Sequence, residues 1–325
     1  LALTKWHKNL YEYLQSTPFI TELVLENHGQ TKLDFSKTSI HRLSIDLTSV
    51  EELRLNDDLE ELLLLGDMSD NCQILVKDHG ASLRLQLDRS LPKVLGLKDL
   101  GAIHCSNILE IDFAQILNNY PKIRELRLWG KPGNILNFHK LSELKELINF
   151  STVDLFGFTA EDIPKPEDLP QLSMFWMSSL PEDAAKVAKK YYKKQQDKGL
   201  NLWITKPRKA EWLAQNLDNP FRSWDGQENI STANAKKAAS LYRKTRASLI
   251  KLLENPNEDT MKHIEALIRE YTQGFNKMDK RNCFIETIER EDIYSALVEI
   301  LDLLPEDLGM DKEKFIEIFD ELKDF

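Results

Sequence analysis

Pairs of apolar residues separated by one residue recur along the first two thirds of the chain, and a further apolar residue stands three positions before many of them. Alternation with a period of two is typical of a β-strand with one buried face. The pattern predicts short strands within residues 20–25, 40–45, 50–55, 59–64, 74–76, 83–87, 123–128, 150–155, 169–174 and 200–202.

The spacing between these strands changes along the chain. Between Leu23 and Leu83 the apolar pairs recur about every ten residues. One coil of a solenoid that contains a strand and the return segment needs about 20 residues, twice this spacing. Either alternate strands lie on opposite sides of short coils, or this region is an antiparallel meander; we favour the coils. From Leu126 onward the spacing opens to 27, 19 and 28 residues, which leaves room for helices between the strands.

The L-x-x-L-x-L spacing resembles that of the leucine-rich repeat superfamily, and the resemblance covers residues 19–206. It implies an α/β fold: a solenoid of short parallel strands, with one set of alternating side chains in the core and the other set on a concave surface. The leucine content agrees, since 32 of the 51 leucines lie within residues 1–150.

Within the first 206 residues, helices are expected at two places. Residues 1–18 are expected to form an N-terminal capping helix, with Thr4 as its N-cap and Pro18 at its end. Residues 181–199 combine an early proline and two acids with a terminal Gly199, and they predict a helix on the convex side.

After Lys206 the strand pattern stops. Residues 207–230 are interpreted as a junction, and residues 231–325 as a bundle of four helices with 3.6-residue apolar spacing. We expect the bundle to dock against the end of the solenoid through Trp212, Phe221 and Trp224. The segments NPFRSWDG and FIETIERED resemble bacterial proteins that join leucine-rich repeats to such a tail, a resemblance that implies no activity.

Four aromatic residues follow the last core position of the later strands, and this position should face the concave surface. They are Trp129, Phe156, Phe175 and Trp203. If the strands stack in one register, these rings form a ladder flanked by polar residues such as Arg127 and Asp154. An apolar stripe with a polar rim is typical of a protein interface. The alternatives are that the helical bundle covers the stripe, or that the frame is shifted by one residue and the rings are core.

The net charge of −10 argues against binding of nucleic acid by the whole surface, but the charge is unevenly distributed. Residues 183–251 contain 16 Lys or Arg and 6 Asp or Glu. This basic band includes Lys189, Lys190, Lys193, Lys194, Arg208 and Arg243. It could bind phosphate or nucleic acid, but the prevalence of lysine favours a solvated surface.

No catalytic motif, metal-ligand spacing or glycine-rich phosphate loop is recognisable, so no cofactor is expected. His104 and Cys105 are adjacent, and neighbours on a strand point to opposite faces. Some bacterial leucine-rich-repeat ubiquitin ligases carry a catalytic C-x-D, but Cys283 is followed by Phe284 and Ile285, and we expect Cys283 to be buried. Three cysteines and the absence of an apolar membrane segment predict a cytoplasmic protein.

The preferred hypothesis is a non-enzymatic module that binds a protein or peptide through the concave face. One alternative is a phosphate- or nucleic-acid-binding protein that uses the band at residues 186–246. The other is an enzyme whose site lies at the junction, around Trp212, Arg222, Trp224 and Asp225. The oligomeric state does not follow from the sequence.

Overall fold

The structure is a computed structural model that describes residues 1–325 except 67, 69–70, 255, 258, 281–282 and 306–310. The chain divides into two compact units, Leu1–Ala210 and Glu211–Phe325. The first unit is mixed α/β and the second is helical, so the α/β class expected from the sequence is confirmed. No helix in the described part of the chain combines the length and the apolar character that a membrane crossing requires.

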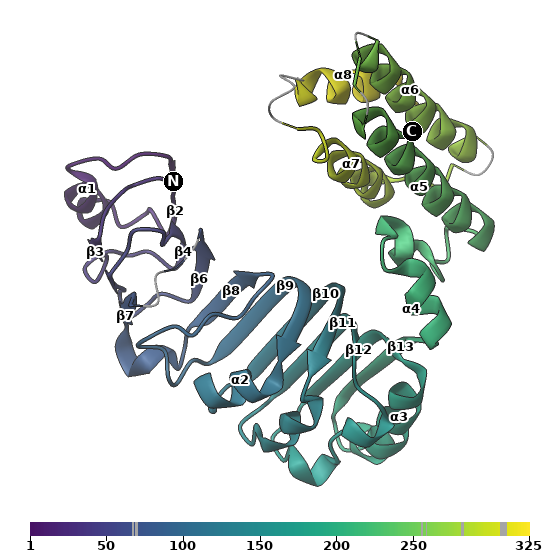
Figure 1. Cartoon of the computed structure of the whole chain (residues 1–325). Coiled ribbons are helices and arrows are strands. Elements are labelled where there is room, and N and C mark those ends of the chain that lie inside the picture. The colour runs from purple at the N-terminus through teal and green to yellow at the C-terminus, as the bar shows by residue number, and fades with distance from the viewer. Residues whose placement is uncertain (67, 69–70, 255, 258, 281–282, 306–310) are drawn as a thin grey trace. The chain divides into compact units, whose positions relative to one another are not determined.

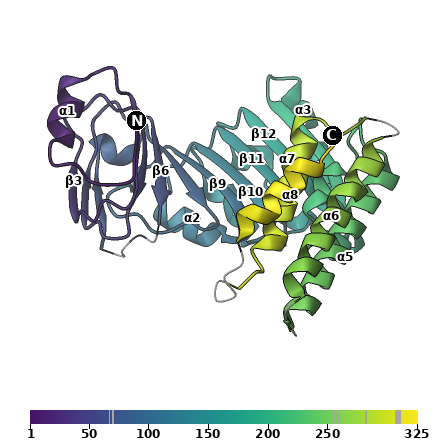
Figure 2. The ribbon, with the colours of Figure 1, turned by 90° about the horizontal axis from the view of Figure 1, so that it is seen from above.

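A large parallel sheet runs through the first unit (Figures 1 and 2). Among the described residues it has ten strands, each hydrogen-bonded to the next in an order that follows the sequence. They are β1 (Ala2–Leu3), β2 (Glu22–Leu25), β4 (Arg42–Asp46), β6 (Glu61–Leu65), β8 (Arg84–Asp88), β9 (Ala102–Asp112), β10 (Glu125–Leu136), β11 (Asn149–Phe156), β12 (Met174–Pro181) and β13 (Asn201–Arg208).

A second parallel sheet contains β3 (Lys32–Asp34), β5 (Glu52–Arg54) and β7 (Gln73–Leu75). From β2 to β8, successive strands therefore lie alternately in the large and the small sheet. This explains the ten-residue spacing of the apolar pairs, because each turn of the chain contributes one strand to each sheet. The alternative of an antiparallel meander is wrong, since both sheets are parallel.

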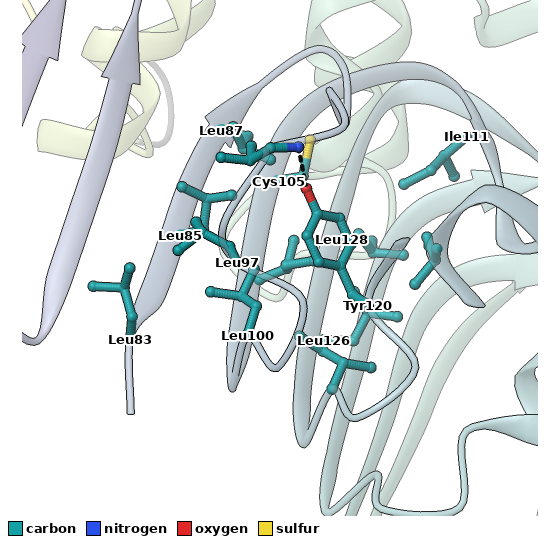
Figure 3. Close-up of a cluster of buried hydrophobic side chains, with 14 of the residues drawn as sticks. Leu83, Leu85, Leu87, Leu97, Leu100, Cys105, Ile111, Tyr120, Leu126 and Leu128 are labelled. Carbon is teal, nitrogen blue, oxygen red and sulfur yellow. Dashed lines mark hydrogen bonds between the residues drawn. The ribbon is translucent and has the colours of Figure 1, made fainter. Parts of the chain in front are cut away.

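The strands pair so that like positions become neighbours, and alternate positions are buried. One core row is almost completely excluded from solvent and consists of Leu23, Leu43, Leu62, Leu85, Ile103, Leu126, Phe150 and Phe175. Burial of each such side chain contributes about 1.5–3 kcal/mol. Figure 3 shows Tyr120 in the same core. Its hydroxyl donates to the carbonyl of Pro92 (2.7 Å) and accepts from the amide of Val94 (3.3 Å).

Seven strands of the large sheet, not including β4 and β10, also share a backbone feature just beyond their outward-facing positions. There the chain enters the left-handed region, with φ between 45° and 68°, at Asn27, Gly66, Arg89, Asn107, Asp154, Ser179 and Lys206. Asn, Asp and Gly tolerate this conformation well, but Arg, Ser and Lys adopt it only when the surrounding structure requires it. The same bend at the same register position shows that these turns of the chain repeat one geometry.

Short helices connect the strands on the core side of the large sheet. Phe113 of α2 (Phe113–Asn119) lies 6.3 Å from Phe150, and Tyr192 of α3 (Glu182–Gln196) lies 4.5 Å from Phe175, measured between ring centroids. Both helices therefore cover the same face of the sheet (Figure 1). The 3₁₀ segments of this unit are η1 (Lys77–Gly80), η2 (Phe138–Glu143), η3 (Ala160–Asp162) and η4 (Pro166–Asp168).

The helix expected at residues 181–199 is confirmed as α3, but the N-terminal helix is shorter than predicted. Helix α1 spans Leu10–Ser16, with Asn9 at its N-cap position in place of Thr4. The preceding residues include strand β1, which pairs with β2. Trp6 lies outside the helix and packs edge-on against Tyr11, with ring centroids 5.1 Å apart.

The second unit contains the four predicted helices, α5 (Thr232–Glu254), α6 (Thr260–Asp279), α7 (Thr287–Leu301) and α8 (Lys312–Leu322). They are preceded by α4 (Ala210–Asn216) and η5 (Pro220–Trp224). Phe221 and Trp224 are buried in the core of this unit, and the Trp224 indole donates to Asp292 (2.8 Å). Both side chains therefore belong to the core of the helical unit, and docking of this unit against the first one stays a prediction.

Candidate functional site on the outer face of the large sheet

The side chains of the large sheet that point away from the core form what we call the outer face. Because the strands pair in register, these side chains lie in three rows. The first row is Glu22, Arg42, Glu61, Arg84, Ala102, Glu125, Asn149, Met174 and Asn201. The second is Val24, Ser44, Leu63, Gln86, His104, Arg127, Ser151, Trp176 and Trp203. The third is Asp46, Leu65, Asp88, Ser106, Trp129, Val153, Ser178 and Thr205.

At its N-terminal end the outer face contains a shallow depression of about 300 Å³ whose lining includes Val24, Ser44 and Leu63. Arg42 crosses it between two acids: its guanidinium lies 3.0 Å from the Glu22 carboxylate and 3.4 Å from that of Glu61. Two carboxylates share one guanidinium here, so this part of the face carries an excess of negative charge.

The middle of the outer face is organised around the Glu125 carboxylate. Its Oε1 lies 2.5 Å from His104 Nε2, 3.2 Å from Arg127 Nε and 3.7 Å from Arg84 Nη2. Its Oε2 accepts a hydrogen bond of 3.1 Å from Asn149. These residues come from four adjacent strands, β8 to β11, and we call them the Glu125 cluster: Arg84, His104, Glu125, Arg127 and Asn149.

The protonation states in this cluster follow from its environment. Burial raises the pKa of Glu125, but hydrogen bonds from His104 and Asn149 and the charge of Arg127 outweigh it, so the net pKa is lowered and the group is ionised at neutral pH. Burial, together with the charges of Arg127 and Arg84, lowers the pKa of His104 more than the neighbouring Glu125 carboxylate raises it. His104 is therefore neutral near pH 7 and donates its Nε2–H to Glu125. One negative charge is shared by two guanidinium groups.

Three donor atoms of this face are buried without a hydrogen-bond partner in the described part of the chain. They are Nε of Arg84, Nε of Arg127 and the indole Nε1 of Trp176. Arg127 Nε is close to Glu125, but the angle does not meet hydrogen-bond geometry. Buried donors without acceptors are unusual in folded proteins, and their concentration on one face marks it as a place where the polar groups are incompletely satisfied.

Towards its C-terminal end the outer face becomes aromatic. Trp176 and Trp203 occupy the same row on adjacent strands and meet edge-on, with ring centroids 5.7 Å apart. Trp129 and Trp203 are about half exposed, at 49% and 50%. Val153 on β11 and Met174, on the same strand as Trp176, add apolar surface.

The predicted ladder of four aromatic rings is wrong. Trp129 lies in the third row and Trp203 in the second, whereas Phe175 is fully buried in the core and Phe156 is 4% exposed at the far end of β11. The frame used for β12 took Met174 as a core residue, but Phe175 and Met177 fill the core. A one-residue slip exchanges the two faces of a strand, so it placed Phe175 on the wrong side.

The two polar residues predicted to flank the ladder, Arg127 and Asp154, occupy different positions on the sheet. Arg127 lies on the outer face as part of the Glu125 cluster, whereas Asp154 is the left-handed residue that follows the third row on β11. Sequence reasoning missed Arg84, His104 and Trp176 as members of this surface. The signal was available for Arg84, since Leu83, Leu85 and Leu87 fix the alternation of its strand.

The basic band is divided between the two units. Lys189, Lys190, Lys193 and Lys194 are exposed on α3, and Arg208 is half-buried at the end of β13. Arg243 belongs to α5 of the second unit, where its Nη1 donates to the carbonyl of Gln215 (3.2 Å). The structure thus brings the four lysines together on one helix.

The residues of the predicted junction site have structural partners within the second unit. The Trp212 indole donates to Asp225 (2.9 Å), Arg222 donates to the carbonyl of Asn219 (3.3 Å), and Trp224 is buried. A depression of about 510 Å³ in this unit is lined by polar groups that include Trp212 and Asp225, but Trp224 and Arg222 do not line it.

Among the described residues, no group of three or more His, Cys, Asp and Glu side chains is placed to hold a metal ion. Cys105 is buried while His104 faces outward, as expected for neighbours on a strand. Cys283 is exposed, so the expectation of a buried residue is wrong; it has a left-handed backbone, with φ of 43°, four residues after the last residue of α6.

The chain was compared with models of protein families, with curated proteins and with solved structures, and none of these comparisons found a match.

Proposed function

We propose that the first unit is a leucine-rich-repeat-like solenoid that binds a protein or peptide partner, without catalysis, on the outer face of its large sheet. The repeat interpretation is supported by the in-register parallel strands and by the left-handed bend that recurs at one register position. In such a solenoid the outer face is the concave one. A cytoplasmic location stays a prediction from the cysteine content.

One observation carries the proposal of binding. The connecting helices α2 and α3 cover the core side of the sheet, and the opposite side presents half-exposed tryptophans beside a cluster that contains two arginines. Tryptophan and arginine are the residues most enriched at the energetic centres of protein interfaces. Exposed apolar surface of this kind costs solubility, so its retention favours a binding role.

The proposal is tested with a double variant, Trp129→Ala/Trp203→Ala, and a matched control, Tyr13→Ala/Phe19→Ala. Tyr13 and Phe19 are exposed aromatic residues, at 52% and 92%, that lie outside the outer face. Partners captured from a native lysate by the unmodified full chain are identified, purified and measured by calorimetry with each variant.

We expect a genuine partner to bind the control as well as the unmodified chain and to lose at least tenfold in affinity for the double variant. Equal affinity for both variants contradicts the proposal.

The phosphate- or nucleic-acid-binding alternative rests on the four exposed lysines of α3. Retention on heparin at low salt that falls steeply as salt rises, and that is lost in a Lys189→Ala/Lys193→Ala variant, would favour it. We expect flow-through, in line with the net charge of −10.

A further inference from the structure

We infer that the outer face recognises an extended acidic peptide segment in which a carboxylate side chain and an apolar side chain stand two positions apart. The carboxylate is bound by Arg84 and Arg127, and the apolar side chain lies on Trp129. This inference rests on the proposed function and specifies the chemistry of the partner.

The charge balance of the Glu125 cluster supports an anionic group. Arg84 and Arg127 approach the same oxygen of one carboxylate, at 3.7 and 3.2 Å. Glu125 is recessed, with 14% of its side chain exposed, while Arg84 and Arg127 are 40% and 37% exposed. The part of the cluster that a partner meets is therefore cationic, with an excess of one positive charge when His104 is neutral.

The balance of acidic and basic side chains excludes the N-terminal end of the outer face as the anion site. There Arg42 lies between Glu22 and Glu61, and the excess charge is negative. An acidic partner is therefore attracted to strands β8 to β10 and repelled from β2 to β6, which fixes where it binds.

The hydrogen-bonding capacity of the arginines points to a carboxylate. A guanidinium group has five N–H donors, and paired guanidinium groups bind planar oxyanions through two parallel bonds. One carboxylate of the protein serves both side chains, which are 40% and 37% exposed and so can be reached by a partner. A second carboxylate supplies two acceptor oxygens and the single negative charge that balances the cluster. A phosphate group would bring more negative charge than the cluster can balance.

The geometry of the strands sets the spacing of the partner's side chains. Trp129 lies two residues after Arg127 on β10 and on the same face, so their side chains stand about 7 Å apart. Alternate side chains of an extended peptide have the same separation. Trp176 lies two strands from Arg127 in the same row, about 10 Å away, with the small Ser151 between them. In a peptide that runs along β10, a carboxylate on the arginines thus places the next-but-one side chain over Trp129.

The experiment uses the full chain and a phage library of random dodecapeptides, followed by calorimetry with synthetic copies of the enriched peptides. We expect enrichment of Asp or Glu two positions from an aromatic or large aliphatic residue. Arg127→Gln should weaken binding by about tenfold or more, since a lost charge-assisted pair has an effect of this size. Arg127→Lys should recover part of the loss, because it keeps the charge but not the planar fork.

The matched control is Arg42→Gln, which removes the same charge from the same face outside the proposed anion site. It should leave affinity within about twofold, and thermal unfolding of every variant shows whether the fold is intact. Equal weakening by Arg127→Gln and Arg42→Gln overturns the inference. So does enrichment of peptides without acids, or no enrichment at all.

Two arms separate this inference from the proposed function and from a phosphate ligand. Peptides that lack acids but bind the unmodified chain and not Trp129→Ala/Trp203→Ala overturn the inference and leave the proposed function standing. Peptides whose binding depends on neither the two tryptophans nor the two arginines overturn the inference and the proposed function together. If a phosphoserine version of an enriched peptide binds more tightly, or millimolar inorganic phosphate displaces the acidic one, the assignment to a carboxylate is overturned.

Discussion

Replacement of Phe175 by alanine tests the register of the sheet most sharply. Phe175 is fully buried, and its ring packs 5.6 Å from Phe150 and 4.5 Å from Tyr192. Truncation of such a core phenylalanine costs about 3–5 kcal/mol, because it leaves a cavity that the neighbouring rings fill only partly. With a urea dependence of about 3 kcal/mol per M, the unfolding midpoint should fall by about 1–1.7 M.

The comparison is Trp203→Ala, which removes a larger side chain from the outer face. Trp203 is half exposed and makes one edge contact with Trp176, so the loss should be about 1 kcal/mol or less. Urea unfolding followed by circular dichroism measures both variants. A loss for Trp203→Ala that equals or exceeds the loss for Phe175→Ala would refute the assignment of core and outer positions.

Two further predictions concern single groups. A thiol reagent should modify one cysteine in the native chain and three after denaturation, because Cys283 is exposed while Cys72 and Cys105 are buried. Burial also raises the pKa of Cys105 to about 12, which keeps this thiol protonated. Rapid modification of two or more thiols in the native chain would contradict this. Acidification should destabilise the first unit in two stages, because the pKa values of His104 and Glu125 both lie below their ordinary values of 6.5 and 4.5. The unfolded chain then binds protons at higher pH than the folded one, so stability falls as the pH drops below 6.5 and falls again below 4.5. Thermal unfolding against pH should show the first stage in the unmodified chain and not in His104→Gln.

The sequence predicted strands well where a leucine pair fixes the alternation. Leu43 and Ile45 define the two faces of β4, and Leu126 and Leu128 do so for β10, so Trp129 was placed correctly on the outer face. In β12 the residues Met174, Phe175, Trp176 and Met177 are all apolar, and alternation carries no information about which are buried. Pairing with the neighbouring strands decides it, and that information is not local.

The candidate site was harder to predict than the fold for the same reason. The Glu125 cluster unites residues from four strands that are distant in sequence, and Arg84, His104 and Arg127 are unremarkable in their own segments. Once the register is known, the first two rows place them side by side. The ten-residue spacing of the apolar pairs predicted that the early strands are divided between two sides of short coils. An antiparallel meander was the alternative interpretation of the same spacing.

The most direct test of binding on the outer face is hydroxyl-radical footprinting of the full chain, free and with a saturating captured partner or enriched peptide. Trp129 and Trp203 are half exposed and should be oxidised in the free chain. We expect the bound partner to protect both strongly while Tyr13 and Phe19 are oxidised as before. Equal oxidation of Trp129 and Trp203 in the free and bound states would contradict the central claim.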